Sequence, residues 1–514
     1  MVRSMGEAGR TQLLWSLSAC AVVLGIAVVI HFLAASADFL ATVRYPIELD
    51  YGEGIVWQQF LRIPGPTMYR LIPESRFVSF HYPPVYYLAV HAMNAAIPDA
   101  LAAGRAVSVL SALAIMPSVT VLVLLATRRP GVPRRWIEVL IALGCAALVV
   151  SLHPIRGWAV LMRVDTLGIA LAFAGLALGI WADGRFLGTV VALLLCVAAV
   201  FAKQTLVAAG VAVCLGAMGR GFKPALAAGA IATAAAVTAL LVMQHLTAGG
   251  FLENLTGNNI NRFALRNLAR VLRDEGSSLA PMIVMLTAGF WLAHRVLPSL
   301  SSGRPGQLLG DLRAAARGGP VNRARLTILL HFALCLVTLV TLFKSGSTYN
   351  YMNEWVCSGC VIIGIMLIDL SRIPSMQRAL VGIVAGLAVA VALLPLRLIP
   401  DTADPLLLAA NQKLVDRIAA ADRPVLSDYM SLIMRAGETV YAEPSIVTEL
   451  AAVGRWDERP LVQKIRDHGF AFVLTWDNKT GLTERRTAAV NAAIRATYPK
   501  VTMIRQGMWL WEEE

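Results

Sequence analysis

Three carboxylates stand close together in the segment Glu48-Leu-Asp50-Tyr-Gly-Glu53, directly after the first long apolar stretch. A carboxylate is ionised at neutral pH, so one that lies beside an acceptor hydroxyl can take its proton while a new bond forms at the oxygen. Asp50 and Glu53 share a face if the segment is helical, because residues three apart lie on one side of a helix. The alternative is an acidic, solvated loop that caps a helix over residues 54–62. The carboxylates could also bind a divalent cation.

A second cluster combines polar and aromatic side chains in the segment His81-Tyr-Pro-Pro-Val-Tyr86-Tyr87. Its paired prolines fix an extended entry to a helix, and its aromatic rings suit the headgroup level of a bilayer. Residues 81–97 are apolar but few, so we expect a juxtamembrane or re-entrant helix here. His81 and Tyr86 are candidate substrate contacts. An aromatic belt at the membrane surface is the alternative explanation of Tyr86 and Tyr87.

Basic residues form a third cluster in the stretch NNINRFALRNLARVLRDEG, where arginines occupy positions 262, 266, 270 and 273. These arginines make one helical stripe and leucines make an apolar stripe beside it, which predicts an amphipathic helix at the membrane surface. Arg262 and Arg266 could bind the phosphate of a lipid or an anionic acceptor, and contact with ordinary phospholipid is the alternative. A further polar turn, Lys344-Ser-Gly-Ser-Thr-Tyr349-Asn350-Tyr351, follows a later apolar segment.

The elements that position these clusters belong in a membrane. Hydrophobic residues make up 57% and charged residues 15% of the 514-residue chain, and the mean hydropathy is +0.65, which is too apolar for a water-soluble protein of this length. The net charge is +13, but many lysines and arginines lie in short loops between apolar segments. The charge therefore gives no support to nucleic acid as a partner. All seven cysteines lie in apolar stretches, so we expect no disulfide framework.

Apolar runs predict an α-helical polytopic membrane protein with about eleven transmembrane helices, or twelve to thirteen with re-entrant segments. These helices start near residues 12, 104, 136, 164, 187, 204, 223, 279, 325, 351 and 378. If the N-terminus is cytoplasmic, every even-numbered connection is basic, in agreement with the positive-inside rule. The odd-numbered connections then lie outside. They include the loops 37–103 and 248–278, which hold the polar clusters.

The composition changes near residue 401 to that of a soluble domain. We therefore predict a transmembrane domain over residues 1–400 and a small periplasmic α/β domain over residues 401–514. The runs PVLSDY, ETVYAEP, FAFVLTW and KVTMIRQGMWLW read as strands. Helical patterns lie around Ser431 and over residues 446–468 and 484–498.

The acidic motif in the first outer loop and the HYPPVYY segment after it resemble those of the GT-C glycosyltransferases. The resemblance is nearest to the protein-mannosyltransferase and aminoarabinose-transferase (family 39-like) enzymes. Arg163-Val-Asp165 resembles the family's Arg and Asp at the outer start of the fourth helix, and Lys203 in FAKQT occupies the place of its TKG turn. The family usually has adjacent Asp and Glu, whereas Tyr-Gly separates Asp50 from Glu53 here.

The resemblance implies an inverting transferase that moves a single hexose or pentose from a polyprenyl-phosphate donor at the outer face of the membrane. Asp50 is then the first candidate for the catalytic base and Glu53 the second. Cations that hold the departing phosphate stabilise the transition state, and the candidates are Arg163, Lys203, Lys344, Arg262 and Arg266. The candidate substrate-binding residues are His81, Tyr86, Asp165, Tyr349 and Asn350. No metal ligand and no cofactor are assigned, and a divalent cation is compatible with the motif.

The expected partners are the polyprenyl-phosphate sugar, membrane lipids and a glycan, lipid or protein acceptor. The expected location is a bacterial inner membrane, with several membrane passes and the C-terminal domain in the periplasm. One alternative is a flippase for lipid-linked glycans, which also needs outer basic residues but no outer carboxylate pair. Another is a membrane scaffold or sensor whose C-terminal domain binds a partner.

Overall fold

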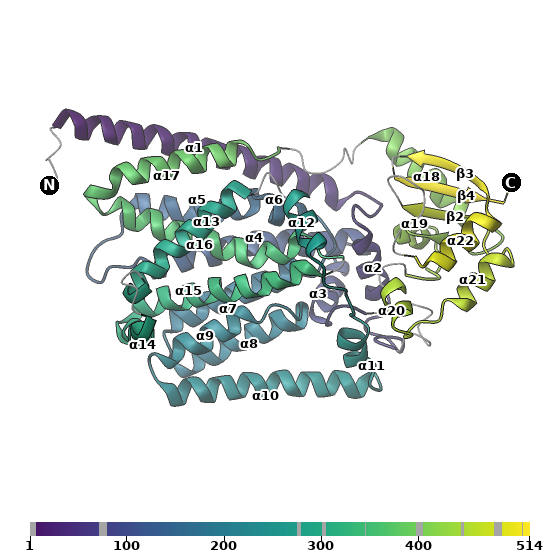
Figure 1. Ribbon diagram of the computed structural model, residues 1–514, viewed down its shortest axis with the longest axis horizontal. Coiled ribbons are helices and arrows are strands. Elements are labelled where there is room, and N and C mark those ends of the chain that lie inside the picture. Colours follow the sequence, from purple (N-terminus) through teal and green to yellow (C-terminus); the bar gives the residue numbers. More distant parts are fainter. Residues whose placement is uncertain are drawn as a thin grey trace.

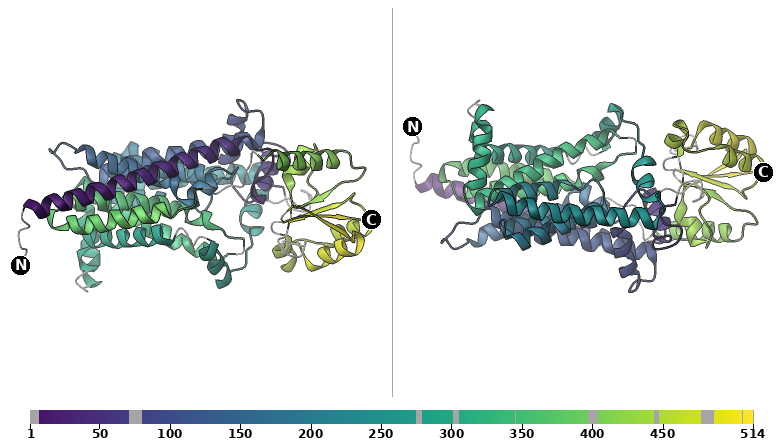
Figure 2. Two further views of the ribbon diagram at one scale, coloured as in Figure 1. Left: turned by 90° about the horizontal axis from the view of Figure 1, so that it is seen from above. Right: turned by 90° about the horizontal axis from the view of Figure 1, so that it is seen from below.

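The computed structural model describes residues 7–70, 80–274, 279–300, 305–344, 346–396, 404–443, 447–476, 486–505 and 507–513. Long, nearly parallel helices form an elongated bundle, and a smaller domain with a β-sheet caps one end of it (Figures 1 and 2). The predicted boundary between residues 400 and 401 falls within residues 397–403, outside the described residues.

A helix begins near each of the eleven predicted starting points, because long uninterrupted apolar runs are the strongest signal in the sequence. These helices are α1 (Glu7–Val43), α4 (Ala100–Ala126), α5 (Trp136–Ser151), α7 (Asp165–Ala182), α8 (Phe186–Ala202), α9 (Ala208–Met218), α10 (Phe222–Leu246), α13 (Leu279–Val296), α15 (Pro320–Thr338), α16 (Asn353–Ser371) and α17 (Gln377–Ala392). Within the described residues, six helices are long and apolar enough to cross a membrane. A seventh candidate joins α5 to α6 (His153–Ala159) across a bend of 62°, and the other apolar helices are shorter.

Helix α16 lies at the centre of the bundle, where 94% of its apolar window is buried. It packs against α4, α5, α13 and α15, whereas α10 lies at the periphery and turns most of its apolar surface outward (Figure 1). Apolar side chains gain little by leaving lipid for a neighbouring helix, so helices in a membrane associate through close packing. Small residues allow such close contacts. At Gly175 in α7, for example, a Cβ atom would lie 2.7 Å from the Ala192 carbonyl oxygen of α8.

The two ends of the bundle differ in chemistry. The start of α1 and the basic connections lie at one end (Figure 1). There Arg372 pairs with Glu138 at 2.9 Å, and Arg323 pairs with Asp183 at 2.7 Å. This end also carries η4 (Pro298–Leu300), η5 (Pro305–Gln307), α14 (Leu308–Arg317) and η8 (Pro374–Met376). The segregation of basic connections to one end agrees with the predicted topology.

The opposite end carries the polar clusters on short elements. These are α2 (Tyr51–Phe60), α3 (Val85–Asn94), α11 (Gly250–Leu252), η2 (Glu253–Gly257), α12 (Leu265–Asp274), η6 (Leu339–Phe343) and η7 (Tyr349–Met352). Helix α3 begins directly after Pro84 and has ten residues, about half the number that a span requires. It packs against α4, as expected for a juxtamembrane or re-entrant helix.

The C-terminal domain contains a four-stranded sheet in the order β1-β2-β4-β3, in which only β1 and β2 are parallel to each other. Its elements are α18 (Pro405–Ala419), β1 (Leu426–Ser427), α19 (Met430–Arg435), α20 (Val447–Ala452), α21 (Arg459–Arg466), β2 (Val473–Trp476), α22 (Ala488–Thr497), β3 (Lys500–Arg505) and β4 (Met508–Glu512). Two strand predictions were wrong in detail. KVTMIRQGMWLW forms two strands of a hairpin, and residues 438–443 of ETVYAEP form no strand.

Candidate active site

Asp50 lies at the start of α2, where the first outer loop turns into the helix. It is the N-cap residue, and its Oδ1 accepts a hydrogen bond of 2.9 Å from the Gly52 backbone N–H. A short acidic side chain suits this position because the first backbone N–H groups of a helix have no partner within the helix. The Asp50 side chain is 30% exposed. This carboxylate is therefore held in place and open to solvent on one side.

Glu53 has the opposite environment, because it is fully buried in an ion pair with Arg105 of α4. Both carboxylate oxygens accept from the guanidinium, at 2.8 and 2.7 Å, and they also accept from the backbone N–H groups of Leu49 and Met162. The remaining Arg105 N–H groups donate to the carbonyl oxygens of Thr42, Tyr45 and Ile47. Glu53 thus anchors the outer loop to α4, and it does not present a free oxygen to an acceptor.

Arg163 faces Asp50 from the turn between α6 and α7. Its Nη1 lies 3.4 Å from Asp50 Oδ1, and its guanidinium carbon lies 4.9 Å from the centre of the Trp158 ring. Gly52 makes this approach possible, since a Cβ atom at that position would lie 1.3 Å from Arg163 Nη1. The glycine that separates the two acidic residues therefore makes room for the cation.

The electrostatic surroundings favour a charged Arg163. Burial works against the charge, whereas the nearby carboxylates of Asp50 and Asp165 favour it, and the pKa of Arg163 is raised. Tyr82 lies 3.5 Å from Arg163 Nη2, and burial raises the pKa of its phenol to about 12. Tyr82 is therefore a neutral hydrogen-bonding group at physiological pH. Arg163 Nε is buried and finds no hydrogen-bond partner among the described residues.

Lys203 follows α8, and Asp165 at the start of α7 binds it in a buried ion pair. Asp165 also accepts hydrogen bonds from Trp158 Nε1 at 2.7 Å and from Asn350 Nδ2 at 2.9 Å. The Lys203 ammonium lies 4.6 Å from the centre of the Tyr351 ring. Asp165 and Asn350, predicted as substrate contacts, are thus both buried partners in a network that fixes Lys203 and the Trp158 ring beneath Arg163.

The other predicted cations lie on a neighbouring platform formed by α12 and the segment before η7. Lys344 pairs with Phe263 in a β-bridge, and Asn267 and Arg270 of α12 donate to backbone carbonyl oxygens of residues 343 and 347. Arg262 and Arg266 are both exposed. Helix α12 (Leu265–Asp274) carries Arg266, Arg270 and Arg273 of the predicted stripe, whereas Arg262 precedes the helix, and its place at the membrane surface stays a prediction. Asp50 forms its ion pair with Arg163, whereas Lys344 and Arg266 lie on this neighbouring platform.

The aromatic residues and the histidine that were predicted to contact substrate mainly contact other protein groups. Tyr86 is fully buried, and its hydroxyl donates to the Gly104 carbonyl at 2.8 Å, so its environment does not fit a substrate contact. The Tyr349 ring packs edge-on against Trp158, with ring centres 5.4 Å apart. His81 Nε2 lies 2.9 Å from a carboxylate oxygen of Glu443 in the C-terminal domain.

The C-terminal domain also contacts α2 directly. Glu48 and Ser431 exchange two hydrogen bonds, at 3.0 and 2.9 Å, and Gln58 lies 3.5 Å from Glu443. Arg435 pairs with Asp99, and its guanidinium carbon lies 4.8 Å from the centre of the Trp57 ring. The domain therefore covers the face of the outer loop beside Asp50.

Comparison with known proteins shows what this arrangement is similar to. No protein-family model and no curated protein sequence matches the chain. The crystal structure of ArnT from Cupriavidus metallidurans bound to undecaprenyl phosphate superposes with a TM-score of 0.53 over 95% of this chain and 97% of that one, at 12% sequence identity. The chain has the GT-C fold.

Two other crystal structures superpose less closely. ArnT from the same organism in the apo state gives a TM-score of 0.47 at 13% identity, over 95% of this chain and 97% of that chain. The apo oligosaccharyltransferase from Archaeoglobus fulgidus gives 0.46 at 11% identity, over 90% of this chain and 69% of that chain. The ArnT structure bound to undecaprenyl phosphate confirms, for the fold, the resemblance predicted from the sequence.

Sequence reasoning missed several residues of this candidate site. Arg105 could have been found, since an arginine inside an apolar helix requires a buried partner. Tyr82 and Trp158 had no such signal, because aromatic residues are common at membrane surfaces. Ser431 and Glu443 could not be assigned, since their contacts span more than 360 residues of sequence.

Proposed function

We propose that this protein is an inverting glycosyltransferase that moves one sugar from a polyprenyl-phosphate donor to an acceptor at the end of the bundle capped by the C-terminal domain. The observation that carries the proposal is the pair formed by Asp50, a fixed and solvent-accessible carboxylate, and Arg163, a largely buried cation beside it. The similar ArnT structure holds undecaprenyl phosphate, which supports a lipid phosphate as the donor.

In the proposed reaction, Asp50 accepts the proton of the acceptor's nucleophilic group as that group attacks the anomeric carbon of the sugar. The bond between that carbon and the phosphate oxygen breaks, and the oxygen keeps the electron pair. Arg163 stabilises the negative charge that develops on the phosphate, and this stabilisation is worth more in the transition state than in the ground state. Attack opposite to the leaving group inverts the anomeric carbon.

Lys203 is proposed as the second cation near the phosphate. It is only 5% exposed, and Asp165 holds its ammonium in place. Asp165 and Asn350 are positioning residues in this scheme, since they act through Lys203 and Trp158. Tyr82, neutral and adjacent to Arg163, is available to bind a phosphate or sugar oxygen.

Glu53 is assigned a positioning role, because its two oxygens are occupied by Arg105 and by backbone N–H groups. For the same reason the pair Asp50 and Glu53 does not fit a shared divalent cation, which needs carboxylate oxygens free to face it. No step of the proposed reaction involves a metal ion.

We place the protein in a bacterial inner membrane with the C-terminal domain in the periplasm. The basic connections gather at the opposite end of the bundle, as expected for a cytoplasmic face. In this orientation Asp50 and Arg163 meet donors that have already reached the outer leaflet.

The purified protein in proteoliposomes tests this function with a panel of labelled polyprenyl-phosphate sugars and an extract of envelope acceptors. The expected result is protein-dependent transfer from one donor class, with inversion at the anomeric carbon seen by NMR. Movement of lipid-linked glycan across the bilayer without any transfer would contradict the proposal and favour a flippase.

A further inference from the structure

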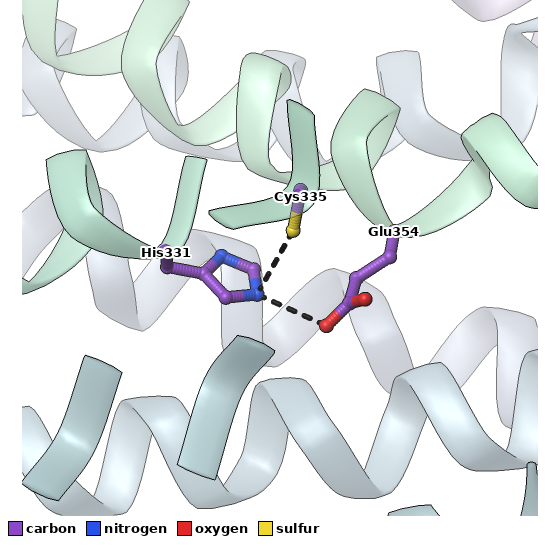
Figure 3. Close-up of side chains that lie close together, drawn as sticks. All are labelled: His331, Cys335 and Glu354. Atoms are coloured by element: carbon purple, nitrogen blue, oxygen red, sulfur yellow. Dashed lines mark hydrogen bonds and ion pairs between the residues drawn. The ribbon is translucent and has the colours of Figure 1, made fainter. Parts of the chain in front are cut away.

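Three potential metal ligands meet inside the bundle, away from Asp50. His331 and Cys335 lie one turn apart on α15, and Glu354 is the second residue of α16. All three are buried, and one ligand atom from each lies within 4.8 Å of the others. Figure 3 shows that the Cys335 sulfur and a Glu354 oxygen both point toward the same ring nitrogen of His331.

The thiol and the carboxylate converge on the same ring nitrogen of His331. His331 Nε2 lies 3.1 Å from Glu354 Oε1 and 3.5 Å from Cys335 Sγ. An imidazole nitrogen carries either one proton or one lone pair, so it cannot make a good hydrogen bond with both groups at once. A metal ion between the three atoms would satisfy all of them.

The two separations from the histidine nitrogen match two edges of a coordination tetrahedron, and the sulfur and the oxygen lie within 4.8 Å of each other. With zinc bond lengths of about 2.0 Å to nitrogen and oxygen and about 2.3 Å to sulfur, a tetrahedron has edges of about 3.5 Å from nitrogen to sulfur and about 3.3 Å from nitrogen to oxygen. The corresponding separations here are 3.5 and 3.1 Å. One thiolate and one carboxylate also balance a doubly charged ion, which removes the net charge from a buried site.

The surroundings supply two further features of a metal site. Ser358 Oγ lies 3.1 Å from His331 Nδ1 and can fix the ring so that Nε2 faces the other ligands. Glu354 also lines a small pocket with Lys203, Thr338 and Thr341, so this ligand residue borders open space.

We propose that His331, Cys335 and Glu354 bind a zinc-class divalent ion that ties the end of α15 to the first turn of α16. Binding replaces the thiol proton of Cys335, which is released to solvent. The ion would fix the start of α16 just after Asn350, the residue that holds Asp165. This inference does not depend on the proposed glycosyl transfer.

Metal analysis of the protein, purified without a histidine tag, tests the site. After loading with zinc and removal of the excess, we expect about one ion per chain. Cobalt exchange should then give the charge-transfer band of a cobalt–thiolate bond. That band should be lost in Cys335→Ser and retained in Cys145→Ser, which changes a buried cysteine of α5 in the same way.

Retention of the cobalt–thiolate band in Cys335→Ser, or much less than one zinc ion in the loaded wild type, would overturn the proposal. X-ray absorption of the zinc-loaded wild type provides a test that does not depend on the folding of a variant. We expect one sulfur in the first coordination shell together with nitrogen and oxygen. A shell without sulfur, or one built mostly from sulfur, would contradict the assignment.

Discussion

At the residue scale, Asp50 and Glu53 carry the same functional group in opposite surroundings. The sequence placed both in one acidic motif, and only the structure separates an accessible carboxylate from one enclosed by Arg105. Their spacing could not reveal this, because burial depends on α4, which packs against the loop from a distant part of the chain. The close approach of Arg163 explains why a glycine stands at position 52, between the two carboxylates.

Glu53→Gln is predicted to destabilise the protein. The change leaves Arg105 buried without a counter-charge, and breaking a buried ion pair in this way costs about 3–5 kcal/mol. Thermal unfolding in detergent should show a midpoint well below that of the wild type. Glu438→Gln, at an exposed position of the C-terminal domain, is the control and should unfold like the wild type. An unchanged midpoint in Glu53→Gln would contradict the structural role.

At the scale of elements, the sequence predicted the long helices well and the sheet less well. Apolar runs identify helices locally, whereas a strand depends on its partners. The pattern of residues 500–511 predicts one continuous strand, but Gly507 has a positive φ of 78° and turns the chain into the β3–β4 hairpin. The sequence gives no local signal for the contact between α2 and α19, because these two helices lie in different domains.

The contact between the first outer loop and α19 should weaken as the pH rises. Burial raises the pKa of Glu48 well above its ordinary range, so the docked state holds this proton more tightly than the unfolded state. The contribution of Glu48 to stability is therefore fully present below the ordinary carboxyl pKa. It falls, by up to about 1.4 kcal/mol per pH unit, as the pH rises through the raised pKa.

Hydrogen exchange of α19 at several pH values measures this effect. The wild type should lose protection as the pH rises, and Glu48→Gln, which stays neutral, should lose less. An identical pH dependence in both proteins would contradict the role of Glu48.

At the scale of the whole molecule, the C-terminal domain docks on the end of the bundle that carries the candidate site. Arg435 reaches across to Asp99, to the Trp57 ring and to the Pro46 carbonyl, whereas Arg455 makes an exposed pair with Glu253. The sequence predicted a separate domain here. It could not predict the docking, because the surfaces that meet are assembled from residues far apart in the chain.

Arg435→Ala is predicted to loosen the docked domain by roughly 1–2 kcal/mol, since it removes a stacked cation and two polar contacts. Arg455→Ala should cost less than about 1 kcal/mol, as expected for an exposed ion pair. Hydrogen exchange of α2 and α19 reports both changes. Equal effects in the two variants would argue against Arg435 as the main docking contact.

The measurement that tests the central claim most directly is single-turnover sugar transfer by Asp50→Asn. Asparagine caps a helix about as well as aspartate, so folding should be preserved, while the loss of the base should slow transfer by about 100-fold or more. Asp404→Asn is the matched control, because Asp404 caps α18 in the same way and lies in the C-terminal domain. Near-normal transfer by Asp50→Asn, or an equal loss in both variants, would contradict the account.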